Sequence, residues 1–197
     1  MTGSVRLVAP DPAYHRSWLA AAEEFLAEGL ARYTEVAIPA DACFVGWEWT
    51  RATLGEPAAF ARMCAERVAQ ADPDRPRPCG WVPTTTRWVV REDGEFLGSM
   101  SLRHVLTPEL AEVGGHIGYS VRPSARGRGV ATAGLRLMLP VAVGLGIDPV
   151  LITCDDDNLA SAAVIERCGG VVQDVRGGKR RYWVPASQDA DRPSSPG

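Results

Sequence analysis

The chain has 197 residues, of which 46% are hydrophobic and 23% charged, as in soluble globular proteins large enough to bury a core. Its net charge of -3 and its pI near 5.7 exclude a global attraction to nucleic acid or anionic membranes, so any anion site must be local. No apolar run approaches the roughly 20 residues of a membrane span, and the N-terminal residues lack the apolar core of a secretion signal. We therefore expect a cytoplasmic protein with no nucleic-acid partner and no membrane partner.

The N-terminal half predicts a strand, two helices and a hairpin. Residues Val5–Ala9 alternate apolar and polar side chains and end at prolines, as an edge strand does. Apolar residues at helical spacing predict a helix over Pro12–Leu30, capped by Asp11, and a second helix over Glu56–Ala69. Two β-rich runs flank the Asp-Gly step at Asp93 and predict the clearest hairpin of the chain.

The C-terminal half predicts alternating strands and helices. In chain order these are a strand over Ile117–Val121, a long apolar helix after Gly129, a strand over Val150–Cys154, a short helix between Asn158 and Gly169, and strands over Val171–Val175 and Arg181–Val184. Pro140 removes the hydrogen bond from its own nitrogen to the Arg136 carbonyl, so we expect a kink or an early stop near Arg136. Composition favours one domain over residues 1–185 and a disordered tail over 186–197.

The segment VRPSARGRGVATAG places arginines and glycines between the end of a strand and an apolar helix. Glycine lets the backbone approach a ligand, arginine supplies positive charge, and a helix beginning here directs free N–H groups to the same place. Arg126, Gly129 and Ala131 satisfy the spacing R/Q-x-x-G-x-G/A, in which consecutive amides bind a pyrophosphate. A P-loop and a dinucleotide fingerprint both fit poorly, and the remaining alternative is a glycine-rich loop with solvated arginines.

At this motif the sequence resembles the GNAT superfamily of acyl-coenzyme A dependent N-acetyltransferases. The resemblance extends over HIGYSVRP, the following helix, VLITCD and DNLASAAVIERCGG, and so covers Arg87 to Trp183. It is closest to a bacterial branch of predicted acetyltransferases in which Gly-Gly ends the last of these helices. The resemblance implies a GNAT-like α/β fold with a mixed, mostly antiparallel central sheet flanked by helices, and a CoA-binding core over about residues 87–184.

The resemblance also implies where acetyl-CoA binds. The strands that correspond to Ile117–Val121 and Val150–Cys154 splay apart in this superfamily, and pantetheine lies between them. The backbone of Ser120 and Val121 would bind pantetheine, and an N–H there would stabilise the thioester oxyanion. The other implied CoA-binding residues are Arg126, Gly127, Arg128, Gly129, Val130, Ala131, Thr132, Asn158 and Ser161. For Asn158 and Ser161, a helix cap and a solvent-facing position are equally good interpretations.

The catalytic groups are less well defined by the sequence. Ile165 occupies the position where many members of the superfamily carry a tyrosine that protonates the leaving thiolate. The substitutes are Ser161, Cys154, Tyr119 and Tyr182, or no acid at all. The candidate bases are His104, Glu109, Glu112 and His116. We rank Glu112 and His116 first, against a structural role for His116 and a solvated loop position for Glu112.

Metal chemistry is not indicated. The five cysteines are scattered, with no C-x-x-C pair and no histidine at zinc-site spacing. The acidic run Asp155–Asp157 complements the positive end of the helix that follows it, and no second ligand cluster accompanies it, so we expect no metal. Trp47, Trp49 and Trp81 fall in irregular stretches, where they either line an acceptor pocket or seal a core.

The sequence thus predicts an acetyl-CoA dependent N-acetyltransferase that acetylates a primary amine by direct attack in a ternary complex, because no activated Cys or Ser nucleophile is recognisable. One alternative is a non-catalytic acyl-CoA sensor or interaction module, which Ile165 at the usual tyrosine position makes possible. The other is a Rossmann-type enzyme that binds NAD. The acceptor is a small-molecule or protein amine whose identity stays open, and a homodimer is a frequent outcome for such chains.

Overall fold

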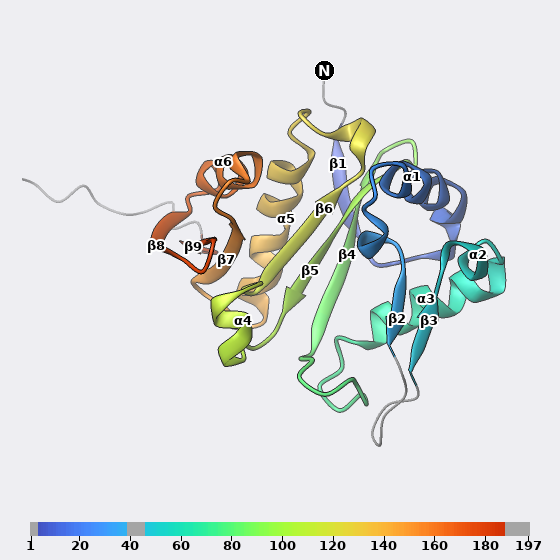
Figure 1. The fold of residues 1–197 in the computed structure, drawn as a ribbon, viewed down its shortest axis with the longest axis horizontal. Helices are drawn as coiled ribbons and strands as arrows, with labels where there is room; N and C mark the ends of the chain where they lie inside the picture. The colour runs from blue at the N-terminus through green and yellow to red at the C-terminus, as the bar shows by residue number, and fades with distance from the viewer. Residues whose placement is uncertain (1–3, 39–45, 188–197) are drawn as a thin grey trace, which may run out of the picture.

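The computed structural model describes residues 4–38 and 46–187 (Figure 1). The strands are β1 (Val5–Val8), β2 (Val36–Ile38), β3 (Trp47–Trp49), β4 (Thr84–Arg91), β5 (Phe96–Arg103), β6 (Ile117–Val121), β7 (Val150–Asp155), β8 (Val171–Arg176) and β9 (Lys179–Val184). The helices are α1 (His15–Ala27), α2 (Arg51–Leu54), α3 (Pro57–Ala69), α4 (Pro108–Glu112), α5 (Val130–Gly144) and α6 (Leu159–Arg167), with 3-10 turns η1 (Pro12–Tyr14), η2 (Ala31–Tyr33) and η3 (Pro123–Ala125). None of these helices is long and apolar enough to cross a bilayer.

Two antiparallel sheets form the centre of the molecule. The larger has the strand order β1-β4-β5-β6 and the smaller the order β7-β9-β8, while β2 and β3 pair with each other alone. In Figure 1 the smaller sheet and α6 lie beyond β6, on the side away from α1, α2 and α3. A single isolated bridge between Gly115 and Ile152 joins the two sheets within the part of the chain that is described. The predicted α/β class with antiparallel strands and flanking helices is confirmed.

Helices cover both faces of the larger sheet. On one face α5 packs against β1, β5 and β6, and Leu135 is fully buried there. On the other face α1 and α3 pack over β4 and β5, and Phe60 is fully buried. Successive residues of β4 serve the two cores in turn, because strand side chains alternate: Val89 belongs to the first core, and Trp88 and Val90 belong to the second.

Local sequence signals account for several element boundaries. The Asp11 carboxylate accepts the Ala13 amide at 2.7 Å at the predicted helix start. The Asn158 side chain accepts the Ser161 amide at 3.0 Å and so caps α6. Gly169 follows that helix with φ of +86°, the left-handed conformation predicted for it. These contacts lie within a few residues along the chain, so sequence patterns predict them well.

Other elements differ from the prediction. The helix predicted over Pro12–Leu30 consists of the turn η1 followed by the shorter helix α1. Glu112, expected in a loop, lies in the short helix α4. Trp47 and Trp49, expected in irregular stretches, form β3, which is held by its pairing with β2. A three-residue strand carries too little periodicity to be recognised without its partner.

The helix α5 continues through Pro140 to Gly144, so of the kink or early stop predicted near Arg136 the early stop is wrong and the kink stays a prediction. Pro140 itself is exposed, whereas its neighbours Leu139 and Ala142 are buried in the core. Burial of the residues around the proline offsets its intrinsic cost, which is about 3 kcal/mol in a helix interior. Tertiary packing has here overridden a local preference.

The first residues of the predicted tail are packed against the protein. Asp148 accepts the Ala186 amide at 2.9 Å and also accepts the Ser187 hydroxyl. Ala186 is buried, at 3% exposure, within the same core as α5. The remainder of that tail, residues 188–197, lies outside the described residues.

Candidate functional site

The strands β6 and β7 meet at one end and then belong to different sheets. At the meeting point the His116 amide donates to the Leu151 carbonyl at 2.7 Å, and the Leu151 amide donates to His116 Nδ1 at 2.9 Å. Gly115, with φ of +60°, lies so close to β7 that a Cβ would come within 2.4 Å of the Leu151 oxygen. Beyond this contact the facing edge of β6 has no strand partner among the described residues. The two strands therefore separate as the sequence predicted.

The register of β6 decides which of its backbone groups face the gap. The Arg122 amide, directly after the strand, donates to the Leu97 carbonyl of β5 at 2.9 Å. Residues two apart in an antiparallel strand face the same neighbour, so Ser120 directs its backbone amide to β5 as well. Tyr119 and Val121 direct theirs to the gap. Of the two predicted pantetheine contacts, Val121 directs a free amide to the open edge, where its carbonyl accepts Arg126 Nε at 3.2 Å, while the backbone of Ser120 is paired with β5.

The loop after β6 carries a run of unpaired amides. Gly127 and Gly129 have φ of +71° and +74°, with open space where a Cβ would be. The amides of Gly127 to Thr132 donate no hydrogen bond of normal geometry to any described residue, whereas the Arg126 amide donates to the Pro123 carbonyl at 3.2 Å. α5 begins within this run, so its dipole adds positive potential. Free N–H groups at a helix start suit a phosphate-like anion.

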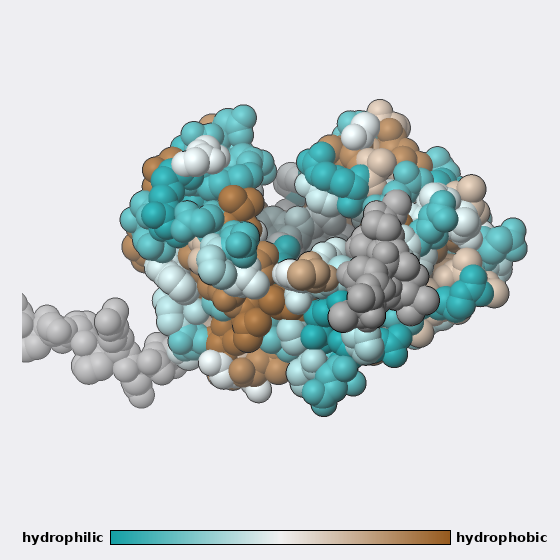
Figure 2. Space-filling model, turned by 60° about the horizontal axis from the view of Figure 1, so that its bottom comes forward, coloured by the Kyte–Doolittle hydropathy of each residue, from teal (hydrophilic) through white to brown (hydrophobic). Residues whose placement is uncertain are grey.

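These amides line a cleft of about 530 Å³, which we call the loop cleft. It lies between the end of α1 and α6, over the end of β6. Figure 2 shows the molecule hollowed between the part that carries its C-terminal strands and the part formed by its N-terminal helices. All predicted CoA-binding residues except one line the loop cleft: Ser120, Val121, Arg126, Gly127, Gly129, Val130, Ala131, Thr132, Asn158 and Ser161. The exception, Arg128, lines a separate hollow beside β1.

A second cleft, of about 360 Å³, adjoins the first and is lined by aromatic side chains of α1, β3 and β4; we call it the aromatic cleft. The residues that line both clefts are Phe25, Tyr33, Tyr119 and Ser120. Trp49 lines the aromatic cleft, and the buried Trp47 stacks on it with ring centroids 4.5 Å apart. Two molecules bound in the two clefts would meet at Tyr119 and Ser120.

The side chain of Tyr119, a residue that lines both clefts, reaches α6. The Tyr119 hydroxyl is 2.6 Å from the Ser161 hydroxyl and donates to the Ser161 carbonyl at 3.3 Å. Burial raises the pKa of Tyr119 to about 12, although the hydrogen bond to Ser161 opposes the shift. Tyr119 therefore stays protonated at neutral pH and can donate a proton. Ile165, by contrast, is fully buried in the core.

The two residues ranked first as bases lie outside the linings of both clefts. Glu112 in α4 is half-exposed and pairs with Arg176 at 2.5 Å. His116 uses Nδ1 to accept the Leu151 amide, and burial, together with the charge of Arg103, lowers its pKa. The structure therefore does not bring Glu112 and His116 together with the predicted CoA-binding residues, and their catalytic role stays a prediction.

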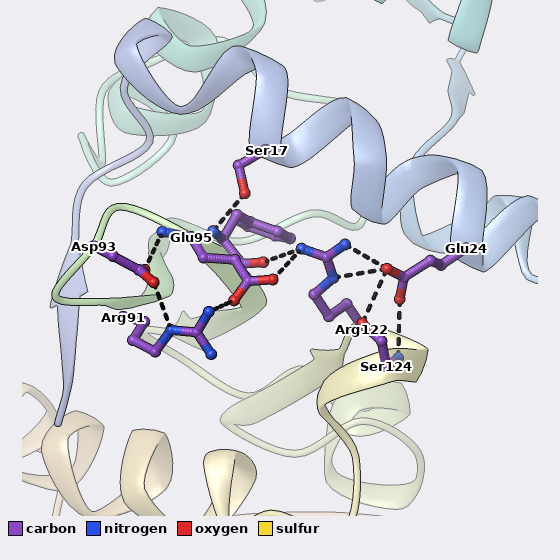
Figure 3. A network of polar contacts seen from close by, with 8 residues as sticks. Ser17, Glu24, Arg91, Asp93, Glu95, Arg122 and Ser124 are labelled. Carbon is purple, nitrogen blue, oxygen red and sulfur yellow. Dashed lines mark hydrogen bonds and ion pairs between the residues drawn. The ribbon is translucent and has the colours of Figure 1, made fainter. Parts of the chain in front are cut away.

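An ion-pair network, which no local sequence pattern predicts, holds the glycine loop against α1 (Figure 3). The Arg122 guanidinium, 7% exposed, pairs with Glu24 of α1 and with Glu95 of the β4–β5 turn, the latter at 3.0 Å. Glu24 also accepts the Ser124 amide and the Ser124 hydroxyl, both at 2.9 Å. Burial alone would raise the pKa of Glu24, but the hydrogen bonds from Arg122 and Ser124 outweigh it and lower the pKa to about 2. The network fixes the entry to the loop.

A divided pair of strands, a run of free amides at a helix start and two adjoining clefts form a site whose shape and charge suit an anionic, extended ligand beside a second molecule. A family model described as an acetyltransferase (GNAT) domain matches residues 16–171. The chain therefore belongs to the GNAT acetyltransferase family, as the sequence motifs predicted. No curated protein matches the sequence. No group of three or more His, Cys, Asp and Glu side chains that could hold a metal occurs among the described residues.

Solved structures share the fold at low sequence identity. The microcin C7 self immunity acetyltransferase MccE, in complex with acetyl-CoA and AMP, has a TM-score of 0.58 at 14% identity, over 93% of each chain. RimJ from Mycobacterium smegmatis, in complex with CoA-disulfide, has a TM-score of 0.58 at 19% identity, over 93% of this chain and 81% of its own. The ribosomal L7/L12 alpha-N-protein acetyltransferase RimL, in complex with coenzyme A, has a TM-score of 0.55 at 16% identity, over 94% of this chain and 95% of its own. These similarities show the fold alone.

Proposed function

We propose that this chain is an N-acetyltransferase that moves the acetyl group of acetyl-CoA to a primary amine by direct attack in a ternary complex. The observation that carries the proposal is the junction of the loop cleft and the aromatic cleft at Tyr119 and Ser120. A thioester held in one cleft and an amine held in the other are neighbours at that point, and such positioning supplies much of the rate of an acyl transfer. The acetyl-CoA and CoA bound by MccE and RimL support the same assignment.

The loop cleft is the site we assign to acetyl-CoA. The free amides of Gly127 to Thr132 would bind the pyrophosphate at the start of α5. The outward-facing backbone of Tyr119 and Val121 would pair with the pantetheine amides as a neighbouring strand does. Asn158 and Ser161 line the same cleft and would contact the CoA arm. Arg128 lies outside the cleft and would contribute only its charge.

In this scheme the amine nitrogen attacks the thioester carbonyl, so a C–N bond forms and the C–S bond then breaks. An outward-facing N–H of β6 stabilises the oxyanion between these events. The Tyr119 hydroxyl, protonated at neutral pH, gives a proton to the leaving sulfur. The base stays a prediction: Glu112 or His116 would take the amine proton through water, since neither lines a cleft.

The acceptor belongs to one of two broad classes. RimL is an alpha-N-protein acetyltransferase of ribosomal L7/L12, and MccE is an acetyltransferase of microcin C7 self immunity. We therefore place both protein N-termini and small-molecule amines in the first panel of acceptors. The aromatic cleft is the site that we assign to the acceptor.

Calorimetric titration with acetyl-CoA, CoA and NAD tests the cofactor, and thiol release over the amine panel tests turnover. We expect both CoA forms to bind, NAD not to bind, and thiol release with at least one amine. Ala131→Glu places a carboxylate among the phosphate-binding amides and should abolish CoA binding. A negative charge in the first turn favours the helix itself, so the variant should fold.

Ala65→Glu on the exposed face of α3 is the matched control and should bind CoA normally. Binding without thiol release would favour an acyl-CoA sensor over the transferase. Full CoA affinity in folded Ala131→Glu would refute the loop cleft as the phosphate site.

A further inference from the structure

The aromatic cleft carries positive charge without counter-charge. Arg32, Arg67 and Arg103 line it, and no aspartate or glutamate of residues 4–38 and 46–187 does. An adjoining hollow of about 320 Å³ shares Arg67 and Arg103, and again none of its lining residues in those ranges is acidic. The two almost fully buried arginines of the described residues are neutralised: Arg122 pairs with two glutamates, and Arg181 pairs with an aspartate at 2.5 Å. Arg67 and Arg103 are partly buried and face the two hollows without such a counter-charge among the described residues.

Neither shared arginine forms an ion pair with a described carboxylate. Arg67 of α3 lies over the ring of Trp49, with its guanidinium carbon 5.3 Å from the ring centroid. Arg103, at the end of β5, donates from Nη1 to the carbonyls of Gly114 and Gly115, both at 3.0 Å. Burial lowers the pKa of both arginines. A cation that is desolvated without a counter-charge is costly, so a ligand anion is the natural complement.

A third polar side chain lines the same hollow and has no hydrogen-bond partner among the described residues. Gln70, at the end of α3, is 5% exposed, and neither its amide nitrogen nor its amide oxygen has a hydrogen-bond partner in the described part of the chain. It lines the hollow together with Arg67 and Arg103. Buried side-chain amides are nearly always hydrogen-bonded in proteins, so this orphan points independently to a polar ligand group.

Resting on the proposed acetyl transfer, we propose that the acceptor amine carries an anionic group, a carboxylate or a phosphate, which Arg67, Arg103 and Gln70 bind. The planar guanidinium fork matches both anions. The aromatic walls of the cleft would cover the apolar part of the acceptor. The same positive field disfavours an ammonium ion, so the acceptor nitrogen loses its proton more readily before it attacks.

Two matched pairs of amines test whether an anionic group on the acceptor is required and distinguish a carboxylate from a phosphate. Phenylalanine against phenethylamine adds a carboxylate, and phosphoethanolamine against ethanolamine adds a phosphate. We expect kcat/KM for thiol release to be about tenfold or more higher for the anionic member of at least one pair, mainly through KM, as charge-assisted hydrogen bonds provide. The pair that shows the larger ratio identifies the anion.

Arg67→Gln should bring the preference ratio close to one, while Arg62→Gln, on an exposed position of the same helix, should leave it as in the parent protein. Arg103 is not used, because its contacts to Gly114 and Gly115 hold the strand junction. Acetyl-CoA affinity confirms that each variant is folded.

Titration of the four amines onto the CoA-saturated protein gives a readout without turnover, and the anionic members should again bind more tightly. Equal rates and equal affinities within both pairs, no binding by either anionic amine, or a ratio that Arg67→Gln does not change would each overturn the anionic acceptor. If the parent protein does not bind acetyl-CoA, the proposed function itself would be refuted.

Discussion

Tyr119 and Ile165 occupy contrasting environments. Tyr119 lines both the loop cleft and the aromatic cleft, and its hydroxyl lies 2.6 Å from the hydroxyl of Ser161 in the loop cleft. Ile165 is fully buried, so a side chain at its position extends into the core and does not line either cleft. A proton donor for the leaving thiolate is therefore better placed on β6 than on α6 in this chain.

Tyr119→Phe removes that donor and leaves the ring in place. Because positioned acids contribute about 100-fold or more, we expect kcat for thiol release to fall by about 100-fold, with little change in acetyl-CoA affinity. Tyr14→Phe removes a hydroxyl that accepts from Arg6 and lines neither cleft, and serves as the control. An unaltered kcat in Tyr119→Phe would exclude this residue as the acid.

At the scale of elements, α1 is tied to the loop that begins α5. Glu24 of α1 holds Arg122 and Ser124, so the helix and the glycine loop are positioned by one carboxylate (Figure 3). Glu28 of the same helix region pairs with Arg126 at 2.6 Å. A displacement of α1 would therefore also move the loop amides that we assign to the pyrophosphate.

Glu24→Gln should lower the free energy of unfolding by about 1 to 3 kcal/mol, because Arg122 stays buried with one carboxylate fewer. It should also weaken CoA binding, since the loop loses its anchor. Urea unfolding and calorimetry measure the two effects. Glu23→Gln removes an exposed partner of Arg51, and its cost should be under about 1 kcal/mol. Equal effects of the two variants would contradict the anchoring role.

The stabilisation that Glu24 provides through its contacts with Arg122 and Ser124 depends on pH. The folded-state pKa of Glu24, about 2, lies below its ordinary value of 4.5. The stabilisation is therefore complete above about pH 4.5 and is lost as the pH falls towards 2, because the unfolded chain binds the proton first.

At the scale of the whole molecule, two partly buried histidines should make stability depend on pH in the mildly acidic range. His116 links β6 to β7, and burial together with the charge of Arg103 lowers its pKa below 6.5. His104 is 2.8 Å from the Thr85 hydroxyl, and burial together with the charge of Arg77 lowers its pKa as well. Below about pH 6.5 the unfolded chain therefore binds more protons than the folded protein.

We expect the free energy of unfolding to fall as the pH drops below about 6.5, before Glu24 titrates. Urea unfolding between about pH 5 and 8 measures the slope. His116→Gln should flatten it by removing one of the titrating groups. A stability that is constant over this range, or a slope that the variant does not alter, would contradict the contribution of His116.

The sequence by itself determined the character of most elements and located the segment that we assign to the pyrophosphate. Caps such as Asp11 and Asn158, the hairpin turn at Asp93 and the spacing of Arg126, Gly129 and Ala131 act over a few residues, so a local pattern is sufficient. The glycine-loop residues that line the loop cleft follow one another along the chain, so the motif located them, whereas lining residues such as Phe25, Leu30 and Tyr33 come from distant segments.

Only the tertiary structure decided the rest of the site. Arg122 and Glu24 are 98 residues apart, and no spacing rule relates them. The aromatic cleft joins residues from α1, α3, β3 and β6, and the unpaired charges of Arg67 and Arg103 become visible only when their neighbours are known. A sequence shows which side chains carry charge, but pairing and burial depend on segments brought together by packing, and these decide which charges remain for a ligand.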